Sequence, residues 1–207
     1  SIATSRKPVQ VARRIGRGVS ERVVDIGEIA LENGEVRLFL NIASFGVTAR
    51  IAHALEEFPR LKRHAGALAF GIATMRAGLG YAPDRVALQV DEQEPVDGPV
   101  AAAAIANGAW FGGGMHVAPT ARLDDGRFEV VRFGDIARSD FVVSLPLLYK
   151  GTHYAHPKVT VAQGATVMAA QSGGAGARAV EIEADGEIVG ALPARFRVRP
   201  AALTLLV

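Results

Sequence analysis

The chain has 207 residues, 49% of them hydrophobic and 21% charged, and its 23 basic and 21 acidic side chains leave a net charge of +2. This near balance excludes the strongly basic surface of a nucleic-acid-binding protein. The absence of cysteine excludes a disulfide framework and a thiolate metal centre, so a reducing cytoplasm is the simplest compartment. The apolar runs at 65–80 and 100–106 are too short or are interrupted by Arg76, so no membrane span is expected.

With 23 glycines, 10 prolines and only 6% aromatic residues, the composition favours many short elements joined by tight turns. Residues 1–20 are interpreted as a helix and linker from a neighbouring domain, with the helix itself at 9–15. A single domain is expected over 21–207. Its first two strands, 22–31 and 35–44, should pair around Asn33-Gly34, a strong hairpin signal.

Helical spacing of apolar residues predicts helices at 47–58 and 61–79, separated by Pro59. Strands at 85–90 and 100–107 are expected to pair around an Asp97-Gly98 turn. A glycine-rich connector is expected at 107–119, then a strand at 127–133 and a helix at 139–149. Five short strands follow, at 157–163, 165–170, 179–184, 194–199 and 203–207, with an Asp185-Gly186 turn after the third of them.

This density of strands predicts a mainly β, α+β fold: an antiparallel β-sandwich with a few helices on one side. Three consecutive glycines, 112–114, permit positive φ and could simply shape a bend between strands. They stand in neither the GxxxxGK[ST] nor the GxGxxG context of a nucleotide-binding loop. Both of these nucleotide-binding readings are therefore rejected.

The block at 106–128 reads ANGAWFGGGMHVAPTARLDDGRF and resembles the signature of the family that includes diacylglycerol kinases, sphingosine kinases and bacterial lipid kinases. Further matches in the same order are VDIG at 24–27, NIASFG at 41–46, LYKGTH at 148–153, EADGE at 183–187 and PAAL at 200–203. The family's GGDGT and GTGN nucleotide motifs are absent and would lie upstream of Ser1. The resemblance implies the C-terminal, lipid-substrate domain of a two-domain, ATP-dependent lipid kinase, inactive without its nucleotide-binding half.

Asp185-Gly186-Glu187 can be read simply as a two-residue hairpin turn. In the resembling kinases, however, the Glu of this motif takes the proton from the lipid hydroxyl, which would make Glu187 the catalytic base. Asp185 would either shape the turn or contact metal and nucleotide across the domain cleft. Such chemistry is sensible, because a hydroxyl that attacks a γ-phosphoryl group needs a positioned carboxylate while Mg²⁺ stabilises the transferring phosphate.

Asp124-Asp125-Gly126 lacks the twelve-position pattern of an EF-hand and can be a solvated turn. The resemblance instead implies a loop for a regulatory Mg²⁺, with the metal held by the Asp125 carboxylate and by the backbone carbonyls of Arg122 and Arg127. Oxygen ligands of this kind suit Mg²⁺. His153 and His156, three residues apart, have no third ligand nearby and receive no metal role.

The expected partners are a lipid alcohol, such as diacylglycerol, and ATP bound mainly by the other domain. A basic cluster at Arg60, Lys62, Arg63 and His64 is either a solvated face or a site of peripheral contact with anionic lipid headgroups, and a homodimer is also considered. Two alternatives stay open. One is a non-catalytic lipid-binding or dimerisation module, and the other is a nicotinamide-nucleotide kinase, which the FGGGM and KGTH segments fit less well.

Overall fold

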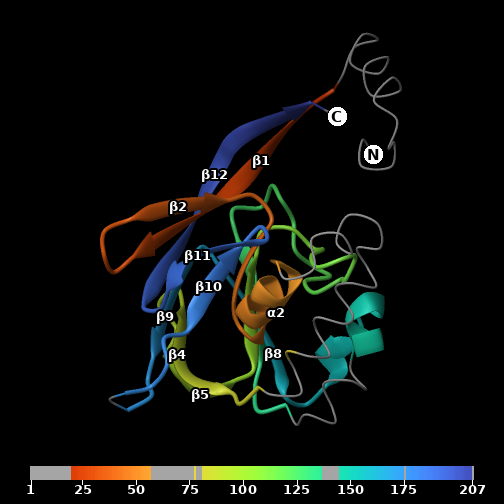
Figure 1. The fold of residues 1–207 in the computed structure, drawn as a ribbon. Coiled ribbons are helices and arrows are strands. Elements are labelled where there is room, and N and C mark those ends of the chain that lie inside the picture. Colours follow the sequence, from red (N-terminus) through yellow and green to blue (C-terminus); the bar gives the residue numbers. More distant parts are fainter. Residues whose placement is uncertain (1–19, 57–76, 78–80, 137–144, 175, 207) are drawn as a thin grey trace.

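Two six-stranded antiparallel sheets pack face to face in the computed structural model, which describes residues 20–56, 77, 81–136, 145–174 and 176–206 (Figure 1). The first sheet has the order β2 (Val36–Phe39), β1 (Glu21–Leu31), β12 (Ala194–Leu206), β9 (Thr166–Gln171), β4 (Asp84–Val90) and β5 (Val96–Val100). The second has the order β11 (Glu187–Ala191), β10 (Glu181–Ala184), β3 (Ile42–Gly46), β6 (Ala102–Ala106), β7 (Phe128–Phe133) and β8 (Val159–Gly164). The predicted β-sandwich is confirmed.

The main hydrophobic core lies between the two sheets. Side chains alternate between the faces of a strand, so in β12 Phe196 and Val198 point inward while the intervening arginines are exposed. Phe39 and Phe128 stack across the core with their ring centroids 5.6 Å apart. Each such buried side chain contributes roughly 1.5–3 kcal/mol. The largest fully buried apolar residues are Phe45, Phe128, Phe196, Ile29, Ile42, Ile105 and Ile182.

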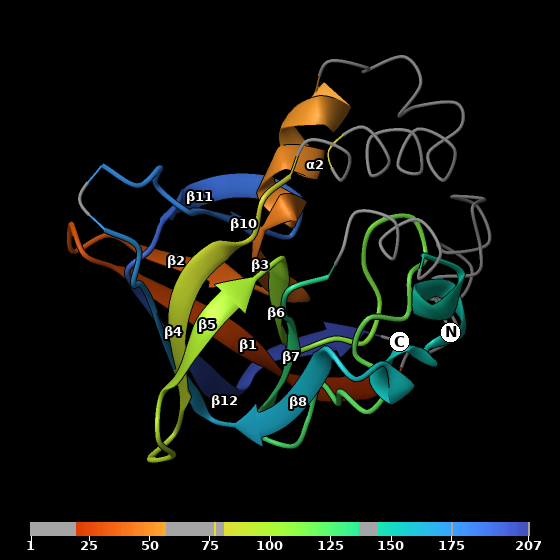
Figure 2. The same ribbon diagram turned by 90° about the horizontal axis from the view of Figure 1, so that it is seen from below.

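The second sheet is also covered on its outer face. Helix α2 (Val47–Glu56), as predicted, continues directly from β3 and lies against β3 and β10 (Figure 2). A helical segment at 145–150 and the short 3₁₀ helix η2 (His153–Ala155) complete this layer. Because both faces are covered, all five residues of β3 and of β6 are buried.

The predicted Asp97-Gly98 turn is wrong. Asp97 and Gly98 lie inside β5, and the chain reverses earlier, at 91–95, where Asp91 has a φ of 50°. β4 pairs with β5 and β9, whereas β6 pairs with β3 and β7 in the other sheet. The Asp97 carboxylate instead accepts hydrogen bonds from Arg85 and Ser172 at the edge of the first sheet.

Two other boundaries differ from expectation. The run at 35–44 is two strands in different sheets, since β2 ends at Phe39 and β3 starts at Ile42. The runs at 194–199 and 203–207 are one strand, β12, which bulges at residues 200–202 opposite Asp25 of β1. The outer parts of β1 and β12 extend beyond the other strands as a two-stranded ribbon (Figure 1).

Strand β11 was not predicted, although its turn with β10 was. The helices expected at 9–15 and 61–79 and the basic cluster at 60–64 fall on residues outside the described ranges, apart from Ala77, which is helical. Of the helices in the described ranges, none has the length and apolar character needed to cross a membrane.

Candidate functional site

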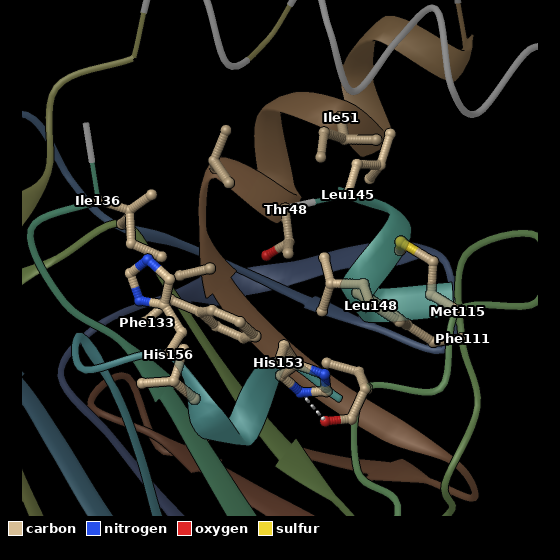
Figure 3. A pocket seen from close by; sticks show the side chains of 15 residues that line it. Thr48, Ile51, Phe111, Met115, Phe133, Ile136, Leu145, Leu148, His153 and His156 are labelled. Carbon is tan, nitrogen blue, oxygen red and sulfur yellow. Dashed lines mark hydrogen bonds between the residues drawn. The ribbon is translucent and has the colours of Figure 1, made fainter. Parts of the chain in front are cut away.

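An apolar cavity lies over the outer face of the second sheet (Figure 3). Ala102, Phe133 and Val159, which pair across β6, β7 and β8, line one side of it. Helix α2 contributes Thr48 and Ile51. The cavity is therefore built from elements far apart in the sequence, and its lining is almost entirely hydrocarbon.

The glycine-rich connector supplies another wall. Phe111 and Met115 form an antiparallel bridge, with reciprocal backbone hydrogen bonds of 3.0 and 2.9 Å. The three glycines between them all have positive φ, from 52° to 102°, which a residue with a side chain rarely adopts. This tight reversal returns the chain so that both Phe111 and Met115 line the cavity (Figure 3). The FGGGM block thus has a structural explanation.

The KGTH segment lies next to this connector and extends the same wall. Gly151 follows the helix at 145–150 with a φ of 68°, and an added Cβ there would lie 2.7 Å from Nδ1 of His116. His153 is 1% exposed, and its ring nitrogen Nε2 lies 3.0 Å from the carbonyl oxygen of Val117. Burial lowers the pKa of His153, so the neutral ring is favoured and Nε2 donates to that carbonyl. His153 is thus a packing histidine that lines the cavity.

The Asp185-Gly186 turn joins β10 to β11, and both residues have positive φ, 50° and 97°. The Asp185 carboxylate accepts hydrogen bonds from the backbone N–H groups of Leu40, Asn41 and Ile42, at 2.7–3.1 Å. The Asp185 carboxylate is therefore already hydrogen-bonded to three backbone N–H groups. Glu187, the first residue of β11, is exposed, and its carboxylate has no hydrogen bond or ion pair with any residue in the described ranges.

The turn and the cavity share one face of the second sheet. Residues directly opposite one another in neighbouring strands point to the same face. Glu183, Ser44 and Ala104 form one such row, and Gly46, Ala102 and Phe133 form the next row along the strands. In the second row Ala102 and Phe133 line the cavity, and the first row leads to the Asp185 turn. A ligand in the cavity could therefore extend along this face as far as the turn. Glu187 pairs with Ala184, whose side chain faces the core between the sheets, so the Glu187 side chain leaves its strand on the opposite face.

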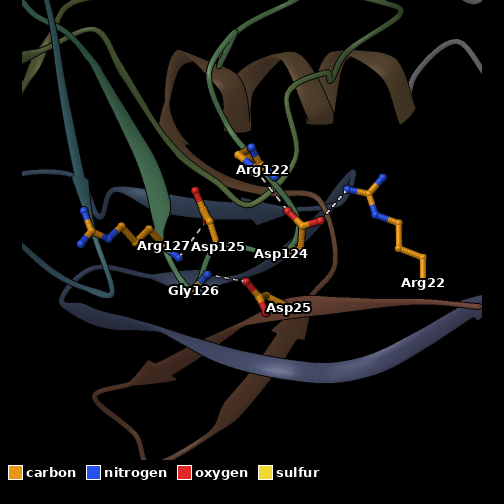
Figure 4. A network of polar contacts seen from close by, with 7 residues as sticks. All are labelled: Arg22, Asp25, Arg122, Asp124, Asp125, Gly126 and Arg127. Carbon is orange, nitrogen blue, oxygen red and sulfur yellow. Dashed lines mark hydrogen bonds and ion pairs between the residues drawn. The ribbon is translucent and has the colours of Figure 1, made fainter.

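The Asp124-Asp125-Gly126 loop is held by a carboxylate from another strand (Figure 4). Asp25 in β1, 3% exposed, accepts hydrogen bonds from the N–H groups of Gly126 and Ala201, both at 2.7 Å. Asp124 forms an ion pair with Arg22 at 3.0 Å, and this guanidinium holds the pKa of Asp124 below its usual value. Asp125 is exposed, and one of its oxygens accepts only the N–H of Arg127, at 3.1 Å.

A buried asparagine connects the two loops. The side-chain N–H₂ of Asn107 donates to the carbonyl oxygens of Asp25, at 2.9 Å, and of Leu40, at 2.7 Å. Asn41, whose backbone N–H binds Asp185, also donates from its side chain to the Trp110 carbonyl at 2.7 Å. Asp25, Asp185 and the glycine-rich connector therefore belong to one hydrogen-bonded unit.

Residues 41–207 match the family model described as the YegS C-terminal NAD kinase beta sandwich-like domain. The chain belongs to this family. Over 202 residues the YegS-type domain is 24% identical to a diacylglycerol kinase from Mycobacterium tuberculosis strain CDC 1551, covering 98% of the chain and 62% of that relative. Over 120 residues it is 31% identical to a probable lipid kinase YegS-like protein from Chromohalobacter salexigens, covering 58% of the chain and 36% of that relative.

Solved structures show the same fold. One crystal structure from Bacillus anthracis str. Sterne superposes with a TM-score of 0.74 at 15% identity, covering 99% of the YegS-type domain and 63% of that chain. A diacylglycerol kinase structure from the same organism gives 0.65 at 13% identity, covering 99% and 60%. The chain thus spans about 62% of the length of the Mycobacterium relative.

The structure brings the proposed site residues of the YegS-type domain into two places rather than one. Asp185 and Glu187 share the β10–β11 turn, and Arg122, Asp125 and Arg127 share the loop before β7. Their functional assignments stay predictions. Within the described residues no three His, Asp or Glu side chains form a metal-binding group.

The Asp125 loop nevertheless fits a metal that keeps most of its waters. The loop is exposed, one Asp125 oxygen has no hydrogen bond, and outside the strand ladders neither the Arg122 nor the Arg127 carbonyl accepts a backbone hydrogen bond from a described residue. A carboxylate with carbonyls and water is the ligand set that Mg²⁺ takes.

Sequence reasoning missed several residues that build the site. The apolar role of Phe111 and Met115 could have been inferred from their places on either side of the glycines. For Asp25, Glu183 and Asn107 the signal was weak, because a polar residue in a strand is usually exposed. Their burial depends on pairing with distant strands.

Proposed function

We propose that this YegS-type domain provides the lipid-binding half of an ATP-dependent lipid kinase that phosphorylates a hydroxyl group of a diacylglycerol-like acceptor. The observation that carries the proposal is that the row of residues leading from the apolar cavity through Glu183 ends at the β10–β11 turn, where Glu187 is exposed. The names of the relatives, a diacylglycerol kinase and a probable lipid kinase, support it.

An acyl chain suits the cavity because its lining is apolar and contains Ile51, Phe111 and Leu148. Burying hydrocarbon stabilises a complex by roughly 0.8 kcal/mol per CH₂ group. The hydroxyl end of the same lipid is polar and would lie outside the cavity, towards the exposed β10–β11 turn. This arrangement separates chain binding from the reacting group.

Glu187 would act as the general base. Its carboxylate is exposed and has no partner among the described residues, so it is available to accept the proton of the attacking hydroxyl. Asp185 cannot easily share this role, because its carboxylate already accepts three amide N–H groups. We assign Asp185 to holding the turn, and contact with nucleotide would be secondary.

Asp125, with the carbonyls of Arg122 and Arg127, would hold Mg²⁺ in the loop before β7. When bound, this metal would be a regulatory ion that links the Asp125 carboxylate to the two carbonyls. ATP would bind mainly to a separate nucleotide-binding domain, since the chain corresponds to only part of its longer relatives. On this proposal the domain alone binds lipid but does not phosphorylate it.

The main test uses the domain joined to its nucleotide-binding domain, labelled ATP, Mg²⁺ and a panel of lipid alcohols. We expect a phosphorylated lipid, and we expect Glu187→Gln to reduce turnover roughly 10²–10⁴-fold while lipid still binds. Glu35→Gln, a change at an exposed carboxylate in the turn between β1 and β2, is the matched control. If lipid binds but no lipid of the panel is ever phosphorylated, the domain is a lipid-binding module instead.

The cavity is tested separately, on the chain by itself, with a fluorescent diacylglycerol analogue in mixed micelles. Thr48→Phe adds a ring to a residue that lines the cavity and should weaken binding about tenfold. Val36→Phe adds similar bulk on the exposed face of the first sheet and should not change binding. Equal affinity of both variants would exclude the cavity as the acyl-chain site.

A further inference from the structure

Glu183 is a buried carboxyl group next to the turn, and the proposed reaction has not yet used it. It lies in β10, two residues before Asp185, and is 7% exposed. Ser44, fully buried in β3, donates its hydroxyl to one carboxyl oxygen at 2.6 Å. The other oxygen accepts the backbone N–H of Gly186, inside the turn itself. Both oxygens of Glu183 are therefore engaged, one by the sheet and one by the turn.

The fold by itself does not require a carboxyl group here. A two-residue Asp-Gly turn with positive φ at both positions is already favoured by its backbone. Burying a carboxylate costs free energy, and burial raises the pKa of Glu183, with the nearby Asp185 charge adding to the effect. An apolar side chain would cover this part of the sheet at a lower cost.

Glu183 lies between the cavity and the turn. Its row across the sheet, with Ser44 and Ala104, is two residues along the strands from the row of Gly46, Ala102 and Phe133, of which the last two line the cavity. Two residues of a strand correspond to about 7 Å. Asp185 anchors one side of the turn to Leu40–Ile42, and Glu183 anchors the next residue, Gly186. Glu187 follows immediately.

We infer that Glu183, held by Ser44, is a positioning residue that fixes the β10–β11 turn and with it the position of the Glu187 carboxylate. This inference rests on the proposed function. Glu183 acts through the Gly186 N–H and does not touch the acceptor. Losing it leaves the turn attached through Asp185 alone and lets Glu187 move relative to the cavity.

The kinetic test compares Glu183→Ala, Glu183→Gln and Glu181→Gln in the two-domain enzyme. Glu183→Ala should lower kcat at least tenfold without changing the KM for lipid. Glu183→Gln should recover most of kcat, because its carbonyl oxygen can accept the Gly186 N–H and its amide can donate to Ser44. Glu181, in the same strand but paired with His53 and Arg178, is the control, and Glu181→Gln should leave kcat unchanged.

A Glu183→Ala enzyme with wild-type kcat, or one in which only KM rises, overturns the inference. Glu187→Gln separates this result from a failure of the proposed function. If Glu187→Gln is inactive while Glu183→Ala is fully active, only the positioning role falls. If Glu187→Gln is fully active, the base assignment falls and the positioning role falls with it.

A spectroscopic measurement on the chain by itself is independent of turnover. The amide resonance of Gly186 should shift as the Glu183 carboxyl group titrates, and Glu183→Gln should abolish this shift. Ser44→Ala, which removes the second hydrogen bond, should broaden or move the same resonance. A Gly186 amide that is insensitive to both changes contradicts the contact on which the inference depends.

Discussion

Two Asp-Gly turns carry the proposed chemistry, and they are held in place in different ways. In the β10–β11 turn, Asp185 itself accepts hydrogen bonds from the N–H groups of Leu40–Ile42. The exposed carboxylate belongs to Glu187, the first residue after the turn. In the loop before β7 the anchor is Asp25 from a distant strand, and the exposed carboxylate is the Asp of the turn itself, Asp125.

The comparison shows that a carboxylate's role follows from its partners and not from its position in an Asp-Gly motif. A carboxylate that accepts several backbone N–H groups stabilises the fold. One that is exposed and lacks such partners remains free to bind a metal or a proton. Asp185 and Asp125 occupy equivalent positions next to a glycine but belong to opposite classes.

The largest expected effect is the loss of stability when Asp25, which anchors the loop before β7, is replaced. Asp25→Asn should lower the free energy of unfolding by about 3 kcal/mol, because two buried N–H groups lose a charged acceptor. Urea unfolding of the chain, followed by circular dichroism, measures this. Asp124→Asn removes only an exposed ion pair and should unfold at nearly the wild-type urea concentration. Equal midpoints for the two variants would contradict the distinction.

Asp185, which anchors the β10–β11 turn, should contribute somewhat less to stability, since it is more exposed than Asp25. We expect Asp185→Ala to cost about 2 kcal/mol through the loss of three hydrogen bonds and a left-handed backbone position. Glu187→Ala should stay within about 0.5 kcal/mol of wild type. Thermal unfolding of the same preparations provides the comparison, which fails if Glu187→Ala is the less stable variant.

The two turns should also respond to pH in opposite directions. Burial raises the pKa of Glu183 above its usual 4.5, so its contribution to stability is present below that value and is lost as the pH rises through the folded-state pKa. Arg22 lowers the pKa of Asp124 below 3.8, so its contribution is present above that value and is lost as the pH falls. Glu183→Gln should flatten the stability profile on the neutral side, and Asp124→Asn on the acid side. Unfolding midpoints between pH 3 and 8 would show whether the slopes differ in sign.

The smallest effect concerns the metal. Titration of the chain with Mg²⁺ should show weak binding that Asp125→Asn reduces about tenfold, because one ligand loses its charge. Asp124→Asn should bind almost as wild type, since Asp124 is engaged by Arg22. Calorimetry can follow both titrations. If Asp124→Asn is the variant that loses binding, Asp124 and not Asp125 is the metal ligand.

Local signals predicted some turns and not others, for a physical reason. Asn33-Gly34 and Asp185-Gly186 both reverse the chain between paired strands, as their left-handed preference suggests. Asp97-Gly98 does not, because its strand continues along the sheet edge while Asp97 binds Arg85 and Ser172. An Asp-Gly pair permits a turn, and the pairing of the flanking strands decides whether one forms.

The sequence by itself determined the β-rich fold class, helix α2, most of the strands and the family resemblance, because alternation, helical spacing and motif order are local properties of the chain. Only the tertiary structure decided which carboxylates are buried and which line the site. Asp25 and Ala201 are 176 positions apart, and Ser44 and Glu183 are 139 apart. Such contacts depend on strand register across two sheets, and shifting a strand by one residue turns every side chain to the opposite face.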